Sequence, residues 1–479
     1  MIDDPLSVFS AAREAPHRDA LVWQSETLSY SALADRVWPV VERLRARGVT
    51  RNTRVAVRAQ NDPEAVFTLL ALMALDATAV LIHPRLTAVE AQCLLDDAAP
   101  SLVLDEGSVT SPRAARDEGW RGQPVAHDPD ATLAMLYTSG TTGRPKGAML
   151  PRGAFVASAA ASAANLGWRD DDRWLLCLPV CHVGGFSVLT RCVMARRCAV
   201  MLPRFDAAAV LASITRDRAT LLSVVPTMLR ALLDHADAAA LSSLRAVLVG
   251  GAATPRSLLE RCASSGVRAL TTWGLTEACS QVTTQRYDEA APLVARDDSG
   301  APLAGFEVEL AGDDGAPVAT GEIGRIRVKG PAVTSGYWRH PPRDGAWLDT
   351  GDLGSFDTER NLTIHARRTD LIVTGGENVY PVEVEHSLME IHGVEAAMVF
   401  GVADERWGQA VAAAIVRSRT IDDEPAWRAS LAAELARRLA PHKRPRKVCV
   451  VDALPMRATG KVDRAEGARA FTPLLRDWK

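Results

Sequence analysis

Lysine is scarce in this chain of 479 residues, although positive charge is not. Arginine supplies 49 of the 55 basic side chains and lysine only 6, against 58 acidic ones, so the formal net charge is −3. Because both signs are interspersed and nearly balanced, the charge pattern argues against a nucleic-acid partner and against an anionic membrane surface. The scarcity also makes the position of each lysine informative.

Long hydrophobic runs are absent too. The longest apolar segment, residues 65–82, contains Asp76 and is followed by His83, so it predicts a buried helix and then a strand rather than a membrane span. The first residues lack a basic segment followed by an apolar core, which argues against secretion. We therefore expect a cytoplasmic protein with no segment inserted into a membrane.

The eight cysteines form no C-x-x-C pair. Cys177, Cys181 and His182 lie close together in the sequence, but no second pair of ligands follows them, so buried free thiols are expected rather than a metal site. With 47% hydrophobic and 24% charged residues, the composition is that of a globular protein. The length of the chain suggests about three structural units.

Strand-like and helix-like segments alternate through the first 250 residues. Short apolar runs predict the strands, and the segments 64–75 and 154–165 predict helices. This alternation is typical of parallel sheets covered by helices, an α/β fold. The predicted strands cover residues 54–60, 78–84, 101–106, 132–140, 173–180, 198–203, 221–226 and 244–251.

The pattern changes near residue 300. From there, alternating apolar residues separated by Gly and Asp turns predict a small antiparallel barrel or sheet. The stretch after Arg367 mixes strand-like and helix-like segments over roughly 110 residues, which is long enough for a small α+β domain.

The strongest local signal is a segment of small and hydroxyl residues at 138–147. It follows a predicted strand, and its small residues let successive backbone N–H groups face an anion. Lys146 adds a compact positive charge suited to a polyphosphate. The plainer alternative is a surface turn, but such turns seldom combine four hydroxyls, three glycines and one of six lysines. The expected phosphate contacts are Thr138, Ser139, Gly140, Thr141, Thr142 and Lys146.

Gly147 follows this lysine where a Walker motif has Ser or Thr, which disfavours a simple NTPase. The segment instead resembles the phosphate loop of the adenylate-forming superfamily, which includes acyl-CoA synthetases, aryl-CoA ligases, luciferases and the adenylation domains of peptide synthetases. Five further motifs follow in the order of that family, so the resemblance covers nearly the whole chain. They are WGLTE at 273–277, TGD at 350–352, RRTD at 367–370, GGEN at 375–378 and TGK at 459–461.

This resemblance implies a two-domain architecture. A large α/β domain over residues 1–367 would hold two stacked sheet–helix subdomains and a small β-barrel. A small mobile α+β lid would cover residues 370–479, with a hinge near 367–370. The pivot would be Thr369, where many relatives have Asp or Lys.

The resemblance also implies the nucleotide contacts. Thr276 and Glu277 correspond to the pair that contacts phosphate and Mg²⁺, and Mg²⁺ prefers oxygen ligands such as a carboxylate. Trp273 stands where the family usually has Tyr, and either ring could flank adenine. Asp352 and Arg367 correspond to the residues that contact the ribose. Alone, each of these residues would be taken as an ordinary turn or surface residue.

Lys461 corresponds to the lysine with which the family binds the carboxylate and α-phosphate oxygens during adenylation. A carboxylate that attacks a phosphate requires cancellation of negative charge in the transition state. The lid would then rotate, and Lys461 would be replaced by a segment that lines a thiol path. That segment has the form found in CoA ligases, and its residues are Gly375, Gly376, Glu377 and Asn378.

Three segments shape the acyl pocket in this family: the residues after His182, the run Gly250, Gly251 and Ala252, and the pair Ser280 and Gln281. Here they resemble those of the o-succinylbenzoate–CoA ligase group of the menaquinone pathway, in which a cation follows the histidine by nine residues. That cation is Arg191, which could hold the second carboxylate of the acid directly or through water.

Two plainer alternatives apply to these residues. Arg191 could face solvent on a helix, and His182 could be a packed loop histidine rather than a residue that closes the acyl site.

These inferences predict an ATP-dependent acid–CoA ligase that uses ATP, Mg²⁺ and CoA, favours o-succinylbenzoate, and releases AMP and pyrophosphate. Another acyl- or aryl-CoA ligase and a stand-alone adenylation enzyme that loads a carrier protein stay open as alternatives. A silent nucleotide-binding relative is a third, against which the intact Lys461, Glu277 and phosphate loop argue. A homodimer is compatible with all of them.

Overall fold

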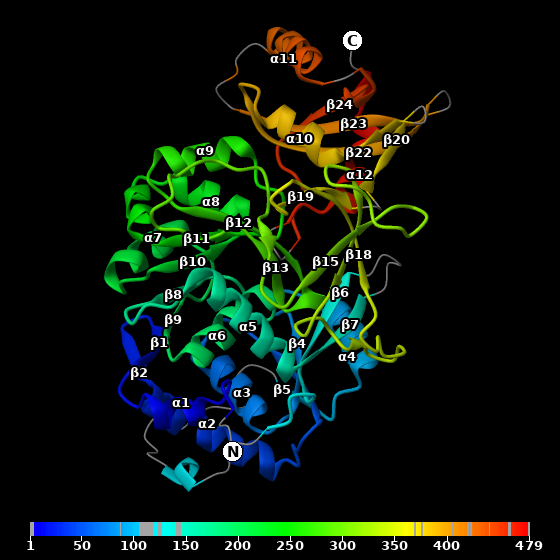
Figure 1. Cartoon of the computed structure of the whole chain (residues 1–479). Coiled ribbons are helices and arrows are strands. Elements are labelled where there is room, and N and C mark those ends of the chain that lie inside the picture. The colour runs from blue at the N-terminus through cyan, green and yellow to red at the C-terminus, as the bar shows by residue number, and fades with distance from the viewer. Residues whose placement is uncertain are drawn as a thin grey trace.

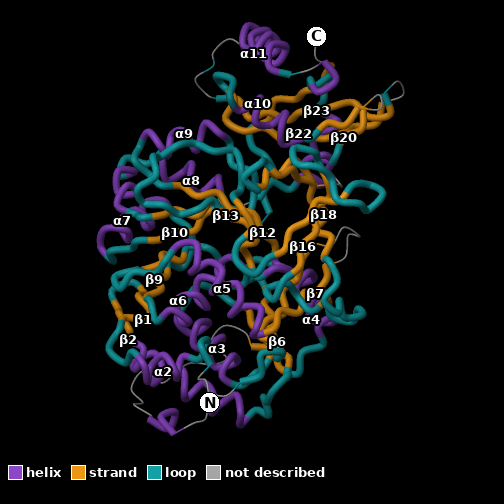
Figure 2. The backbone as a smooth tube through the Cα atoms, in the orientation of Figure 1, coloured by secondary structure: helices purple, strands orange, loops and turns teal. Residues whose placement is uncertain are grey.

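The chain folds into three sheets in a large N-terminal part and a fourth sheet in a smaller C-terminal part (Figures 1 and 2). This is the α/β architecture expected from the sequence, with a large first domain and a small second one. The computed structural model describes residues 4–86, 88–104, 118–122, 127–139, 145–367, 370–374, 377–404, 407–418, 421, 424–439, 441–457 and 461–477.

The first sheet has the strand order β17-β7-β6-β4-β3-β5. Strands β5, β3, β4 and β6 run parallel, as their apolar runs predict, whereas β7 is antiparallel to both of its neighbours. The strands are β3 (Arg54–Arg58), β4 (Thr78–Ile82), β5 (Leu102–Leu104), β6 (Thr132–Ser139), β7 (Pro145–Pro151) and β17 (Gly336–Tyr337). The candidate phosphate loop therefore joins two strands of a hairpin, β6 and β7.

The second sheet has the order β14-β13-β12-β11-β10-β8-β9-β1-β2. Its pairings from β12 through β11, β10, β8 and β9 to β1 are parallel, and antiparallel strands flank this block on both sides. The strands are β1 (Asp19–Trp23), β2 (Glu26–Ser29), β8 (Arg173–Leu176), β9 (Cys198–Met201), β10 (Leu221–Val224), β11 (Ala246–Val249), β12 (Ala269–Leu275), β13 (Ser280–Thr284) and β14 (Ala301–Pro302).

Helices fill the space between the two sheets and cover their outer faces. α5 and α6 lie in the middle of the large domain, where the rings of Phe155 and Phe186 meet edge to face at 5.0 Å (Figure 1). Burial of one such ring stabilises the fold by about 1.5–3 kcal/mol. The helices of this domain are α1 (Val8–Glu14), α2 (Tyr30–Ala46), α3 (Pro63–Ala74), α4 (Ala88–Ala98), α5 (Arg152–Leu166), α6 (Val183–Ala195), α7 (Ala207–Arg216), α8 (Pro226–Leu233), α9 (Arg256–Ser264) and the 3-10 turns Glu118–Gly122, Ala238–Ser243 and Thr276–Ala278.

Local sequence signals explain where α3 begins. The side chain of Asp62 accepts a hydrogen bond from the amide of Ala65 at 2.7 Å, and Pro63 occupies the first turn, where its missing N–H costs no hydrogen bond. The preceding Asn61 does not cap the helix. Its amide donates to the carbonyl oxygen of Leu178 at 3.0 Å, so it connects α3 to the segment that precedes α6.

The region predicted as a small β-barrel forms an antiparallel sheet in the order β15-β16-β18-β19. Among the described strands no pairing joins β19 back to β15, so the sheet is open. Its strands are β15 (Glu307–Ala311), β16 (Gly324–Lys329), β18 (Leu348–Phe356) and β19 (Leu362–Arg367).

The C-terminal part is an α+β unit above the large domain in Figure 1. Helices α10 and α11 pack on one face of its sheet and α12 on the other. Its elements are β20 (Ile372–Thr374), β21 (Glu377–Val379), α10 (Pro381–Met389), β22 (Val394–Asp404), β23 (Gly408–Arg417), α11 (Glu424–Arg438), the 3-10 turn Pro441–Lys443, β24 (Lys447–Val451), α12 (Arg464–Phe471), the 3-10 turn Thr472–Leu474 and β25 (Arg476–Asp477). No helix in the described ranges is long and apolar enough to cross a bilayer.

Candidate active site

Residues from both large sheets meet where parallel strands end. His83 follows β4, Gly250 and Gly251 follow β11, and Glu277 follows β12 in a 3-10 turn. The carboxyl ends of parallel strands are where α/β sheets usually place ligand contacts, because the loops there converge. The predicted nucleotide and acyl residues thus come from segments far apart in the sequence but close to the same edge of the fold.

One end of this site is organised around the carboxylate of Glu277, which is 9% exposed. Its Oε1 accepts hydrogen bonds from the hydroxyl of Thr138 at 3.1 Å and from that of Tyr337 at 2.9 Å. Burial, with the charge and hydrogen bond of Glu277, raises the pKa of Tyr337, so the phenol stays a donor at neutral pH. The ammonium of Lys146 lies 5.6 Å from the Tyr337 ring centroid.

This arrangement brings a phosphate-loop residue and the predicted Mg²⁺ ligand into direct contact. Both hydrogen bonds to the Glu277 side chain use the same oxygen, and a buried carboxylate held in this way fits the oxygen-donor requirement of Mg²⁺. Thr138 and Lys146 are Cα partners across the β6–β7 hairpin. The loop residues Gly140, Thr141 and Thr142 lie outside the described residues, and Ser139 is described only in its backbone, opposite Pro145.

The other end of the site receives Lys461 from the C-terminal domain. A Cβ atom added to Gly251 would lie 3.3 Å from Cε of Lys461 and 3.9 Å from its Nζ. Gly251 has φ of +83°, a conformation that other residues rarely adopt. A larger side chain there would be strained and would meet Lys461. The lid is therefore positioned so that Lys461 reaches the strand ends of the large domain.

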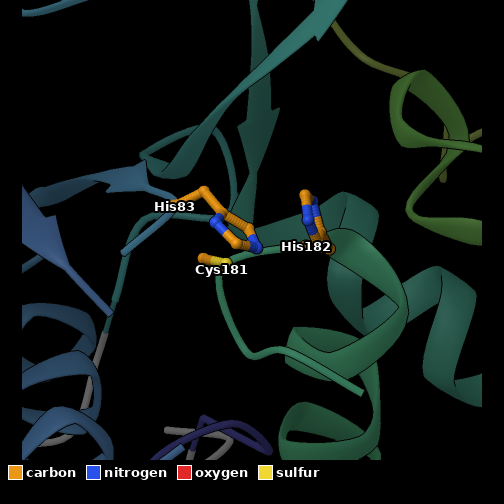
Figure 3. Close-up of side chains that lie close together, drawn as sticks. All are labelled: His83, Cys181 and His182. Carbon is orange, nitrogen blue, oxygen red and sulfur yellow. The ribbon is translucent and has the colours of Figure 1, made fainter. Parts of the chain in front are cut away.

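A cluster of His83, Cys181 and His182 lies beside this point (Figure 3). Potential ligand atoms of all three fall within 4.8 Å of one another, and the two imidazole rings have centroids 5.1 Å apart. Burial, the neighbouring His83 and the charge of Lys461 lower the pKa of His182 to about 4, so its ring is neutral at physiological pH. Its Nε2 is buried without a hydrogen-bond partner among the described residues.

The electrostatic surroundings of this cluster suit an anion better than a metal cation. Lys461 acts on His182, and the positive charge of Arg85 acts on both His83 and Cys181. Nδ1 of His83 accepts the backbone N–H of Arg85 at 3.0 Å, which places the ring proton on Nε2, where a metal would have to displace it. Burial raises the pKa of the Cys181 thiol to about 12.

Arg191 on α6 is buried, with 3% of its surface exposed. The alternative that it faces solvent is therefore wrong. Its guanidinium lies 5.5 Å from the centroid of the Trp174 ring, but its Nε and Nη2 have no hydrogen-bond partner among the described residues. Burial lowers the pKa of Arg191 to about 10, against opposing contributions from Cys192 and Cys279, which leaves it charged at neutral pH.

A further buried polar side chain lies on β13, the strand that packs against α6. The amide nitrogen of Gln281 donates to the hydroxyl of Thr284 at 3.1 Å, but Oε1 of Gln281 has no hydrogen-bond partner among the described residues. The helix and this strand are joined by the hydroxyl of Ser187, which donates to the carbonyl oxygen of Cys279 at 3.2 Å. Buried polar atoms are normally satisfied, so this part of the molecule is suited to take up a polar ligand or ordered water.

The other predicted acyl-pocket residues lie on both sides of these groups. Gly250 and Ala252 flank Gly251 after β11, and Ser280 begins β13. A Cβ on Gly250 would approach the Thr272 methyl group to 2.8 Å, so the close contact of β11 with β12 favours glycine there. Thr276 opens the 3-10 turn that carries Glu277.

The predicted ribose contacts lie across a strand pair. Asp352 on β18 and Arg367 on β19 are Cα partners, although only the backbone of Arg367 is described. The indole N–H of Trp273 donates to Oδ2 of Asp352 at 2.9 Å. The Trp273 ring is only 8% exposed and packs among apolar residues between β12 and the four-stranded sheet.

Several expectations cannot be placed. The hinge residue Thr369 and the CoA-segment residues Gly375 and Gly376 lie outside the described residues, and Glu377 and Asn378 are described only as backbone in β21.

The structure also brings to the site two residues that lie in none of the recognised motifs. The Tyr337 hydroxyl donates a hydrogen bond to Glu277 from 60 positions away, and the His83 ring lies against the His182 ring at a tilt of 38°. The only sequence signals were the rarity of tyrosine, with 5 in the chain, and the Gly-Tyr-Trp run at 336–338.

Comparison with known proteins gives the family. A model of AMP-binding enzymes matches residues 8–338, and a model of the C-terminal domain of AMP-binding enzymes matches residues 383–461. The chain belongs to the AMP-binding enzyme family. The candidate phosphate loop at 138–147 and Glu277 fall within the first matched range and Lys461 within the second, whereas Asp352 and Arg367 lie between the two ranges.

Two relatives resemble the chain over more than nine-tenths of its length. A 2-succinylbenzoate–CoA ligase of Bacillus mycoides is 37% identical over 468 residues, which covers 94% of this chain and 95% of that one. The o-succinylbenzoate CoA synthetase (MenE) of Bacillus subtilis, in complex with the acyl-adenylate intermediate OSB-AMP, superposes with a TM-score of 0.84 at 32% identity, covering 97% and 98% of the two chains. A structure of the same enzyme with ATP and magnesium ion also has a TM-score of 0.84, at 32% identity and with 97% and 99% covered.

Proposed function

We propose that this protein is an AMP-forming ligase that activates 2-succinylbenzoate, also called o-succinylbenzoate, with ATP and transfers the acyl group to CoA. The observation that carries the choice of acid is the buried guanidinium of Arg191, which has no acidic partner among the described residues. An uncompensated buried charge is costly, so such a group is expected to have a partner in the working enzyme. The 37% sequence identity to a 2-succinylbenzoate–CoA ligase, over 94% of the chain, supports the same acid.

The substrate has the charge that this region needs. 2-Succinylbenzoate carries two carboxylates, of which one reacts and the other must be held while desolvated. A charge-assisted hydrogen bond from Arg191, directly or through water, would supply about 1.5–3 kcal/mol toward its binding. A simple fatty acid has no second carboxylate and would leave Arg191 as it is in the free protein.

The first half-reaction joins the acid to AMP. A carboxylate oxygen of the acid attacks the α-phosphorus of ATP, an O–P bond forms, and the bond to the β-phosphate breaks to release pyrophosphate. We assign phosphate binding to the 138–147 loop and Thr276, and charge cancellation to Lys461, whose ammonium lies beside Gly251. Glu277, positioned by Thr138 and Tyr337, would hold Mg²⁺. Mg²⁺ supplies a Lewis acid that neutralises phosphate charge.

The second half-reaction forms the thioester. The CoA sulfur attacks the acyl carbonyl carbon, a C–S bond forms, the C–O bond to AMP breaks, and the thiol proton is released. We propose that the unit 370–479 rotates on a hinge near Thr369 relative to 1–367, so that Lys461 leaves and the 375–378 segment approaches. His182, neutral and close to Lys461, would close the acyl site between the two steps.

Three basic residues of the small domain that could bind the phosphates of CoA already have contacts within the chain. Lys443 makes an ion pair with Glu383 at 2.6 Å, Arg444 donates to the carbonyl of Leu439 at 2.9 Å, and Arg446 stacks 4.4 Å from the Trp407 ring centroid. Each already has an intramolecular contact, so a CoA phosphate would have to compete for it.

Product analysis tests the proposal. The purified full-length protein is incubated with ATP, Mg²⁺, CoA and 2-succinylbenzoate, and 2-succinylbenzoyl-CoA, AMP and pyrophosphate are measured by mass spectrometry and coupled assay. Equal amounts of the three products are expected. Benzoate, cinnamate and hexanoate serve as competitors, and a faster reaction with any of them would overturn the assignment of the acid.

Two other outcomes would change the class of reaction. Pyrophosphate release with no CoA thioester would favour an enzyme that loads a carrier protein. The absence of carboxylate-dependent ATP–pyrophosphate exchange with all four acids would favour a silent nucleotide-binding relative. A cytoplasmic location and a homodimer are part of the proposal, and fractionation of the native cell and light scattering of the purified protein test them.

A further inference from the structure

A buried hydrogen bond near the predicted nucleotide residues joins Trp273 to Asp352. The indole N–H donates to Oδ2 of the carboxylate at 2.9 Å, and the two residues are 8% exposed each. An indole nitrogen is a donor only, so this bond has a fixed direction and requires an acceptor such as a carboxylate. In a buried setting, an indole N–H without an acceptor would be poorly satisfied.

The placement of Trp273 explains what this bond can do. Trp273 lies on β12, four residues before Glu277, whereas Asp352 lies on β18 of the four-stranded sheet. The ring belongs to an apolar cluster that also contains Val282 of β13 and Val328 of β16, so the cluster joins the two sheets. The bond therefore connects the strand that presents the phosphate-site carboxylate to the strand that presents the ribose-site carboxylate.

The local backbone restricts movement at both ends of this connection. A Cβ on Gly274 would lie 1.6 Å from the carbonyl oxygen of Ser280, so β12 and β13 approach too closely for any other residue. Next to Asp352, Gly351 has φ of +74°. The backbone N–H of Asp352 donates to the hydroxyl of Thr350 at 3.2 Å, and that hydroxyl donates to the carbonyl of Ile326 at 2.9 Å.

We infer that Trp273 is a positioning residue for the ribose: its indole N–H orients the Asp352 carboxylate toward the ribose hydroxyls, at a fixed distance from the phosphate site. This inference rests on the proposed function for the role of Asp352. It assigns the tryptophan a hydrogen-bonding task through its N–H, beside any contact that its ring makes with adenine.

Nucleotide binding without acid or CoA tests this inference. Calorimetry on the full-length protein compares ATP with 2′,3′-dideoxyATP, which lacks the ribose hydroxyls, for the wild type and for Trp273→Phe, which keeps an apolar ring and removes the N–H. We expect Trp273→Phe to weaken ATP binding about tenfold and dideoxyATP binding less than twofold, since a well-placed hydrogen bond to a charged group is worth about 1.5 kcal/mol. In Asp352→Asn, the added Trp273→Phe change should have little further effect.

A matched control exists elsewhere in the chain. The indole N–H of Trp120 donates to Oδ1 of Asp35 at 2.9 Å, also with a buried ring, but in a 3-10 turn that contacts α1 and α2. Trp120→Phe removes the same kind of bond and should leave the ratio of the two nucleotide affinities unchanged. Trp273→Tyr is a second variant that checks folding, because the family usually has tyrosine there and such a chain is expected to fold.

Equal weakening of ATP and dideoxyATP by Trp273→Phe would overturn the inference and leave Trp273 a packing residue. The same conclusion follows if the wild type binds the two nucleotides equally. Failure of the ligase assay with 2-succinylbenzoate, in a protein that binds ATP and discriminates against dideoxyATP, would instead overturn only the proposed acid.

Discussion

Two buried arginines on neighbouring helices have opposite surroundings. Arg152, at the start of α5, is 3% exposed and makes ion pairs with Asp4 and, at 2.9 Å, with Asp76. Arg191 on α6 is also 3% exposed but has no acidic partner among the described residues. The fold satisfies the first charge from within the chain, and in the proposed function the acid satisfies the second. On that proposal, the contrast separates an arginine that stabilises the domain from one that selects a substrate.

The largest effect is expected on the free energy of unfolding, when the paired arginine Arg152 is removed. Arg152→Leu leaves two buried carboxylates without their cation, which typically costs about 3–5 kcal/mol of the free energy of unfolding. Urea denaturation followed by circular dichroism measures the loss. The KM for the acid in the surviving folded fraction should stay at the wild-type value, and a change there would end the distinction between the two arginines.

The pH dependence of stability follows from the same pair. Burial raises the pKa of Asp76, but its contacts with His127 and Arg152 outweigh this and hold the pKa below its usual value. Asp76 therefore contributes stability that is present above its unfolded pKa and is lost as the pH falls through its folded pKa. Arg152→Leu should lose less stability on acidification than the wild type does.

The next largest effect is expected for Lys461 of the C-terminal domain. Lys461→Ala should slow adenylate formation by about 10²–10³-fold, because it removes a charge from the transition state. Thioester formation from supplied acyl-adenylate should be largely unaffected, since the proposed rotation removes Lys461 from the site before that step. Single-turnover assays separate the two steps. Lys447→Ala, which changes a lysine on β24 of the same domain, is the control, and equal loss in both steps would contradict the rotation.

Removing the unpaired arginine should affect the acid alone. Arg191→Met keeps much of the side-chain volume and removes the charge, so the KM for 2-succinylbenzoate should rise about 10- to 100-fold with little change in the KM for ATP. The free energy of unfolding should be unchanged or higher, because a buried charge without an acidic partner is replaced by an apolar group. Lower stability with an unchanged KM would return Arg191 to the same class as Arg152.

How far the sequence predicts these features depends on whether the residues are contiguous. The phosphate loop, WGLTE and TGK are short runs, so their chemistry is visible without a structure. The strands of the first half follow from apolar runs bounded by Gly and Pro, and β3, β4, β6 and β11 lie within their predicted ranges. In contrast, the burial of Arg191 depends on how α6 packs against β8 and β13, which no periodicity encodes.

Contacts between distant segments were missed for the same reason. Glu277 and Tyr337 are 60 positions apart, and nothing local to Tyr337 indicates that its hydroxyl meets a carboxylate. The open order of the four-stranded sheet likewise depends on pairing of distant strands, which alternation alone does not distinguish from a barrel. Short motifs in the sequence identify candidate site residues, and the structure adds the side chains from distant segments that contact them.

Substitution of Tyr337 should have the smallest and most selective effect. Tyr337→Phe removes one hydrogen bond to Glu277 and should raise the Mg²⁺ concentration needed for half-maximal adenylation by about 3- to 10-fold, with the KM for the acid unchanged. Tyr137→Phe is a matched control, because the Tyr137 hydroxyl donates to Oδ2 of Asp97 at 2.6 Å, so the same kind of bond is removed. An equal Mg²⁺ effect in both variants would show that the change reflects general loosening of the domain. An effect confined to Tyr337 would place it with Glu277 in the metal site, just as an effect of Arg191→Met confined to the acid would place that arginine in the acyl site.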